Sequence, residues 1–192
     1  MMRIGILIAL ACMVAACASS PTPRYYTLAP VAADNAPKAT ASYRVAVGPV
    51  TLPELVDRPH LVLRSGANQV IIAEHHRWAE PLRHELPRVI AANLARELGA
   101  WVGDARESTS QGADYRVAID VRRFDSTLGE SVTIEALWVI RGNSGATPYR
   151  GHSLVREPAR DGYDGLVAAH DRALAAMSRE IASALQGEAA QP

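Results

Sequence analysis

Residues 115–122 read YRVAIDVR, in which apolar side chains at every second position alternate with mostly polar ones. A period of two is typical of a β-strand with one buried face. Residues 132–141 form a second strand-like run, apolar on both faces near its centre, and residues 149–156 form a third, more polar run. Turn sequences at 128–131 and 142–145 separate the three runs. The pattern predicts an antiparallel three-stranded meander.

Shorter apolar segments precede the meander. Residues 44–50, RVAVGPV, predict a buried strand that ends at the glycine and proline. Residues 53–59, PELVDRP, then predict a loop. Apolar runs at 61–64 and 69–74 flank the turn sequence SGAN and predict a hairpin.

Two amphipathic helices are expected. Apolar residues between 82 and 98 recur on one stripe, and Pro81 suits the first turn of this helix. Pro87 lies inside the pattern and predicts a kink or a delayed start. The last helix is expected to begin at a capping Asp164 and to end at Gly187.

The order of elements is strands, helix, three strands, helix. Helices that are segregated from an antiparallel sheet are typical of the α+β class. We therefore expect a two-layer sandwich, with a mostly antiparallel sheet and both helices on one face. The sequence shows no internal repeat, and residues 43–187 are expected to form a single domain.

The N-terminus has the pattern of a secretory signal. A positively charged start precedes an apolar run over residues 4–16, which is too short for a good transmembrane span. The run ends in VAAC, similar to a bacterial lipobox, and predicts removal of residues 1–16 and lipidation of Cys17. Cys12 follows the poorer match ALA. An ordinary cleaved signal, or a membrane anchor with incidental cysteines, is the alternative.

Residues 17–42 follow as a predicted tether, rich in Ala, Pro, Ser and Thr. Within it, residues 25–28, YYTL, are strongly strand-forming, and we expect them to add a short first strand to the sheet. The two residues after Cys17 are Ala and Ser, with no Asp. By analogy with lipoprotein sorting in Gram-negative bacteria, this favours the outer membrane, with the domain facing the periplasm.

Composition excludes several classes of function. The 192 residues carry 20 basic and 20 acidic side chains, a balance that argues against broad nucleic-acid binding. Both cysteines lie within the first 17 residues, so the rest of the chain can form neither a disulfide framework nor a cysteine-based zinc site.

Candidate catalytic and metal-binding residues are few. His75, His76 and His84 lie among glutamates, but without the spacing of a helical metal motif, and a solvated connection between strand and helix fits them better. His170, next to Asp171, fits a histidine at the edge of the core that bonds to a neighbour. A pair of carboxylates for glycoside hydrolysis stays an open alternative, because two such residues need not be adjacent in the sequence. We assign no catalytic, cofactor-binding or metal residues.

Four segments in order carry a resemblance to a known family. They are residues 25–28 (YYTL), 45–59 (VAVGPVTLPELVDRP), 77–82 (RWAEPL) and 166–181 in the last helix. With the lipobox, they resemble the ABC-type transport auxiliary lipoprotein family over nearly all of residues 17–186. The sequence departs from the family pattern at His60 and Pro87, which bears on local geometry.

The resemblance implies a periplasmic domain that is tethered to the outer membrane and belongs to an intermembrane lipid transport system. The implied partner is an MCE-domain protein that forms a lipid tunnel. The implied inner-membrane component is an ABC transporter permease or a paraquat-inducible A-type membrane protein. A homo-oligomeric ring docked on the tunnel is also implied. The role would be docking and positioning, with no cofactor and no enzymatic activity.

The loop and the first strand are our candidates for protein contacts. The residues are Tyr25, Tyr26, Leu55, Val56, Asp57, Arg58 and Pro59. A turn and an edge strand with roles in the fold alone would explain these residues as well. A stand-alone periplasmic lipid-binding lipoprotein and a small periplasmic hydrolase are the alternative functions.

Overall fold

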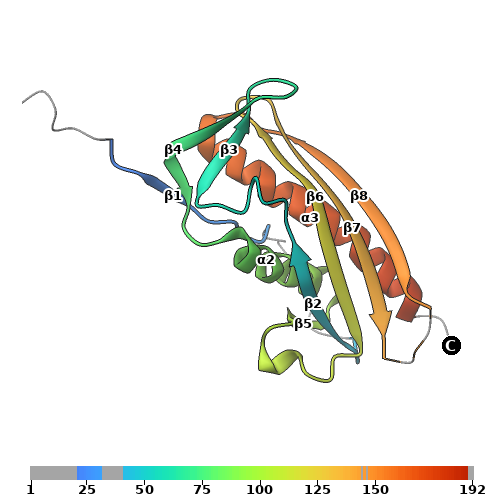
Figure 1. The fold of residues 1–192 in the computed structure, drawn as a ribbon. Helices are drawn as coiled ribbons and strands as arrows, with labels where there is room; N and C mark the ends of the chain where they lie inside the picture. Colours follow the sequence, from blue (N-terminus) through green and yellow to red (C-terminus); the bar gives the residue numbers. More distant parts are fainter. Residues whose placement is uncertain (1–20, 32–40, 144, 146, 190–192) are drawn as a thin grey trace, which may run out of the picture.

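The computed structural model describes residues 21–31, 41–143, 145 and 147–189. Two sheets and two long helices make up this part of the chain (Figure 1). The smaller sheet has the order β1-β4-β3, with β1 at Arg24–Tyr26, β3 at His60–Arg64 and β4 at Val70–Trp78. The larger has the order β5-β2-β6-β7-β8, with β2 at Arg44–Thr51, β5 at Trp101–Asp104, β6 at Tyr115–Thr127, β7 at Ser131–Gly142 and β8 at Tyr149–Pro158.

The predicted meander is confirmed. Strands β6, β7 and β8 are antiparallel neighbours, and Ile119 lies opposite Trp138 in the ladder between the first two. The alternating apolar residues Val117, Ile119 and Val121 are all buried. This agrees with the period of two in the sequence, because every second side chain of the strand points to the helices.

The predicted hairpin forms as the antiparallel pair β3 and β4, whereas the sequence did not reveal three parallel pairings. β2 is parallel to both β5 and β6, and β1 is parallel to β4. β2 does not end at its Gly-Pro sequence but continues to Thr51, with a shift in register between Val47 and Val50. An irregularity of this kind lets a strand continue past residues that cannot keep the regular ladder.

The helices α2 (Leu82–Leu98) and α3 (Gly162–Ala189) pack against one another and against the larger sheet, as expected for the α+β class. α2 covers β2 and β5, whereas α3 covers β7 and β8. A short 3₁₀ helix, η1 (Ser108–Ser110), lies between β5 and β6. None of the helices in the described ranges is long and apolar enough to cross a bilayer.

Three helix boundaries differ from the expectation. α2 begins directly after Pro81, so Pro87 lies inside the helix and does not delay its start. α3 begins at Gly162, two residues before Asp164, and continues past Gly187 to Ala189. A single glycine costs only about 1 kcal/mol inside a helix, and the buried Leu185 keeps this last turn on the core.

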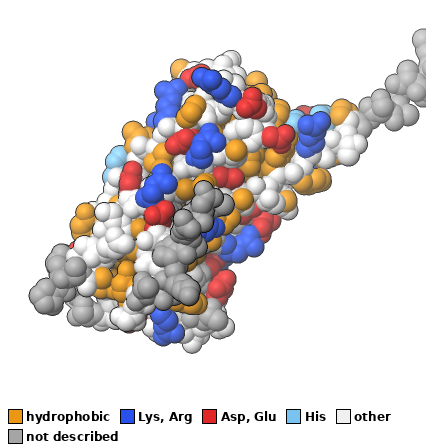
Figure 2. Space-filling model, turned by 180° about the vertical axis from the view of Figure 1, so that it is seen from behind, with side chains coloured by type: hydrophobic (Ala, Val, Ile, Leu, Met, Phe, Trp, Pro, Cys, Tyr) orange, Lys and Arg blue, Asp and Glu red, His pale blue; other side chains and the backbone are white. Residues whose placement is uncertain are grey.

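The expected first strand forms as β1 and pairs with β4 of the smaller sheet. The signal segment 1–16, the predicted lipidation site Cys17 and residues 18–20 and 32–40 of the predicted tether lie outside the described residues. On the face shown in Figure 2, basic and acidic side chains of the described residues lie interspersed rather than in patches of one charge.

Candidate functional site

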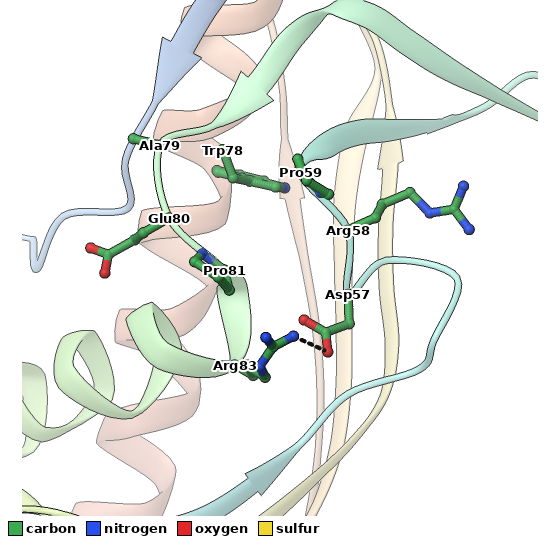
Figure 3. A pocket seen from close by; sticks show the side chains of 8 residues that line it. All are labelled: Asp57, Arg58, Pro59, Trp78, Ala79, Glu80, Pro81 and Arg83. Atoms are coloured by element: carbon green, nitrogen blue, oxygen red, sulfur yellow. Dashed lines mark hydrogen bonds and ion pairs between the residues drawn. The ribbon is translucent and has the colours of Figure 1, made fainter.

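A cavity of about 220 Å³ lies where the loop after β2 meets the connection from β4 to α2 (Figure 3). The loop ending at Pro59 forms one wall, and residues 77–82, which we call the tryptophan segment, form the other. Both segments belong to the stretches that carry the family resemblance. The lining residues are Asp57, Arg58, Pro59, Trp78, Ala79, Glu80, Pro81 and Arg83.

Backbone hydrogen bonds hold the two walls together. The Trp78 N–H donates to the carbonyl of Pro59 over 2.7 Å, which joins the end of β4 to the loop. The loop turns back on itself because the N–H of Val56 donates to the carbonyl of Pro53 over 3.0 Å. Trp78 is 5% exposed, so its ring belongs to the core as well as to the cavity.

Charged groups of both signs line the rim. Arg83 Nη1 lies 3.1 Å from Asp57 Oδ2, and Arg88 pairs with Glu80 beside it. The arginines are about half exposed, so these ion pairs contribute little to stability. In Figure 3 the Arg58 side chain extends away from the Asp57–Arg83 pair. An aromatic and proline surface flanked by charge suits recognition of a protein partner.

The predicted contact residues divide by burial. Tyr25 is 63% exposed and Leu55 is 39% exposed, so both can reach a partner. Tyr26 and Val56 are buried in the core, where they fix β1 and the loop instead of facing solvent. Asp57, Arg58 and Pro59 line the cavity, as noted above.

Residues 24–31, which we call the N-terminal strap, are held by both helices. The Leu28 N–H donates to Glu85 Oε1 of α2 over 2.8 Å, and the Ala29 N–H donates to Asp171 Oδ1 of α3 over 2.9 Å. Arg96 of α2 donates to the carbonyl of Val31. Sequence reasoning missed Glu85, although its position three residues after Leu82 places it on the apolar face of α2.

Burial raises the pKa of Glu85 to about 7, because the ionised carboxylate is desolvated. The hydrogen bond from Leu28 lowers this pKa, but by less than burial raises it. Burial likewise raises the pKa of Asp171 to about 6. The second oxygen of Glu85, Oε2, has no hydrogen-bond partner among the described residues. Ionisation of Glu85 therefore opposes folding, since the folded state holds the proton more tightly than the unfolded chain.

A Glu85→Gln variant should become more stable than the native protein as the pH rises. Between pH 4.5 and about 7 the native protein loses free energy of unfolding as Glu85 ionises, whereas glutamine does not titrate. We expect the difference to grow across this window by on the order of 3 kcal/mol and to stay constant above it. Urea unfolding at several pH values measures it. A difference that does not change with pH would show that Glu85 ionises normally.

Two of the histidines singled out in the sequence, His76 and His170, have structural partners. His76 lies in β4 and stacks on Tyr163 with a centroid distance of 3.4 Å, and its Nδ1 lies 2.7 Å from the hydroxyl of Tyr26. It is therefore part of a packed strand, not of a solvated connection. The described residues contain no group of three or more side chains placed to hold a metal.

His170 is fully buried, not at the edge of the core as expected. Its Nε2 lies 2.8 Å from Ser126 Oγ, and its ring stacks on Phe124 at 4.2 Å, so its partner is a strand residue instead of Asp171. Burial lowers the pKa of His170 to about 3, which keeps the ring neutral in the core.

The family model of the ABC-type transport auxiliary lipoprotein component matches residues 26–182, from the strap through most of α3. The chain belongs to this family. It is thus an auxiliary lipoprotein component of a transport system. The match includes both walls of the cavity and the two helices that hold the strap.

The proteins to which the chain is similar are distant in sequence. The chain is 27% identical over 144 residues to the intermembrane transport lipoprotein PqiC of Escherichia coli K12, covering 74% of this chain and 75% of the relative. A crystal structure of an uncharacterized protein has a TM-score of 0.69 at 23% identity, covering 86% and 99% of the two chains. A Xanthomonas campestris protein has a TM-score of 0.64 at 22% identity, covering 84% and 93%. The two structures share the fold.

Proposed function

We propose that this auxiliary lipoprotein is anchored in the outer membrane through Cys17 and docks an MCE-domain protein of an intermembrane lipid transport system. Its role is to position that partner, as part of a homo-oligomeric ring, without making or breaking bonds. The inner-membrane permease or paraquat-inducible A-type component is then reached indirectly, through the partner. The name of the Escherichia coli relative, an intermembrane transport lipoprotein, supports the transport system that we propose.

The observation that carries the docking role is the cavity after β2. The loop and the tryptophan segment are about 20 residues apart in the sequence, yet they form its two walls. Leu55 stands exposed at the start of the loop, and Arg58 extends from it. We place the partner contact on this loop, with Tyr25 of β1 as a further candidate.

Affinity capture of the full-length protein from membranes in mild detergent tests the proposal. We expect an MCE-domain protein to copurify in fixed stoichiometry, identified by mass spectrometry. The size of the captured complex reports how many copies of the chain take part. Capture of the acylated, folded protein alone would contradict the docking role.

A pair of leucine variants tests the place of the contact. Leu55→Glu puts a charge on the loop, and we expect it to lose the partner, because burying an unpaired charge at an interface is costly. Leu154→Glu is the matched control, since Leu154 is also exposed, at 57%, but lies on β8. Equal capture by both variants would move the contact away from the loop.

A further inference from the structure

The hairpin of β3 and β4 exposes apolar side chains at one end of the molecule. Val70 is 37% exposed, Ile71 54% and Ile72 42%. Leu128, in the turn between β6 and β7, is 41% exposed and lies at the same end (Figure 1). We call these four residues the apolar tip. The partner strand β3 differs, because its Leu61, Val62 and Leu63 are buried.

Arginines from three strands surround a depression beside the apolar tip. The depression is lined by Arg64, Arg123 and Arg156, with Asp125 between them, and by Gly66 and Ala67 of the hairpin loop, among others. Arg64 donates through Nε to Asp125 Oδ1 over 3.0 Å, and its side chain is 35% exposed. Arg156 pairs with Glu130 over 2.7 Å and is 64% exposed. These side chains can bind further oxygen acceptors at the tip.

The strap shortens the chain between the domain and Cys17. Because residues 24–31 are bound to β4 and both helices, the chain between the lipidated residue and the first fixed strand runs only from Cys17 to Arg24. Its seven residue steps reach at most about 25 Å when fully extended. A domain that is anchored through Cys17 must therefore stay within this distance of the membrane.

The direction of β1 decides which end of the domain faces the anchor. β1 is parallel to β4 and Arg24 lies level with His76, so the chain enters β1 from the side of His76 on which β4 begins. The apolar tip begins at Val70, at most about 20 Å from His76 along β4. A fully extended stretch from Cys17 can therefore place the lipid and the tip at the same depth.

We propose that the apolar tip is a second membrane contact, which rests on the lipid surface that holds Cys17. The apolar side chains enter the interface between head groups and acyl chains, while Arg64 and Arg156 bind phosphate oxygens of the head groups. One acylated residue and one apolar contact then fix the orientation of the domain, with the η1 end pointing away from the membrane. The inference rests on the proposed lipidation of Cys17.

Depth-dependent quenching of a fluorophore tests this contact. The acylated mature protein is reconstituted in phosphatidylethanolamine and phosphatidylglycerol vesicles, with or without bromine on the acyl chains. A fluorophore is attached to an introduced cysteine in Ile72→Cys or, as the control at the opposite end, in Gln111→Cys. We expect bromine to quench the fluorophore at position 72 and to leave the one at position 111 unchanged.

Each other outcome points to a different conclusion. Unquenched fluorescence at both positions, with the acyl mass confirmed by mass spectrometry, would overturn the membrane contact. Crosslinking of Ile72→Cys between copies, without quenching, would make the tip an interface within an oligomer and would overturn it too. A protein that lacks the acyl mass would contradict the anchor itself and thus the proposed function. Capture of the MCE-domain partner is a separate measurement, which tests the docking role independently of the membrane contact and of the anchor.

Discussion

A Cys17→Ser variant is expected to lose acylation and to leave the outer-membrane fraction completely, while the uncleaved apolar segment 4–16 keeps it at the inner membrane. Serine lacks the thiol that accepts the diacylglycerol, and without that modification the lipoprotein signal peptidase does not act. Each buried methylene of an acyl chain contributes about 0.8 kcal/mol, so several chains on one residue make anchoring effectively permanent and their loss all-or-none. Flotation of membranes on a sucrose gradient, together with metabolic labelling by palmitate, measures the result.

Cys12→Ser is the matched control for this experiment. Cys12 lies in the same N-terminal segment but follows a poorer match to the lipobox. We expect Cys12→Ser to be acylated and to float like the native protein. The reverse pattern, with labelling lost only in Cys12→Ser, would place the anchor at Cys12 and lengthen the stretch that precedes the strap.

Trp78→Ala is expected to cost about 3 to 5 kcal/mol of the free energy of unfolding, as is typical of large aromatic side chains removed from a core. Trp78 is 5% exposed, and its ring contacts Phe124 and His170 edge-on at centroid distances of 6.4 and 5.9 Å. Its removal leaves a void where the smaller sheet meets the larger sheet and α3. Chemical denaturation followed by circular dichroism measures the change.

Trp101→Ala serves as the control for the size of the side chain. Trp101 is 38% exposed on the edge strand β5, and we expect a loss of about 1 kcal/mol or less. If both variants lost the same free energy, Trp78 would not join the two sheets as described. A folded Trp78→Ala protein would also show, in the capture experiment, whether this wall of the cavity matters for docking.

The candidate site could be predicted only in part. The loop from Leu55 to Pro59 stands out in the sequence, and its last three residues do line the cavity. The sequence could not show that Tyr26 and Val56 point inward, because short irregular segments have no periodicity that separates a buried face from an exposed one. Glu85 was missed because a glutamate near the start of a helix is ordinarily a solvated residue that favours the helix dipole.

The sequence alone determined the meander and both amphipathic helices, because the spacing of apolar residues within one segment selects which of its faces is buried. The lipobox is equally local, and it predicts the anchor without reference to the fold. Only the tertiary structure decided the parallel partners of β2, the strand β5 and the position of the strap on the helices. Each of these depends on contacts between segments far apart in the chain. The Leu28–Glu85 hydrogen bond, for example, joins residues 57 positions apart and leaves no local pattern in either segment.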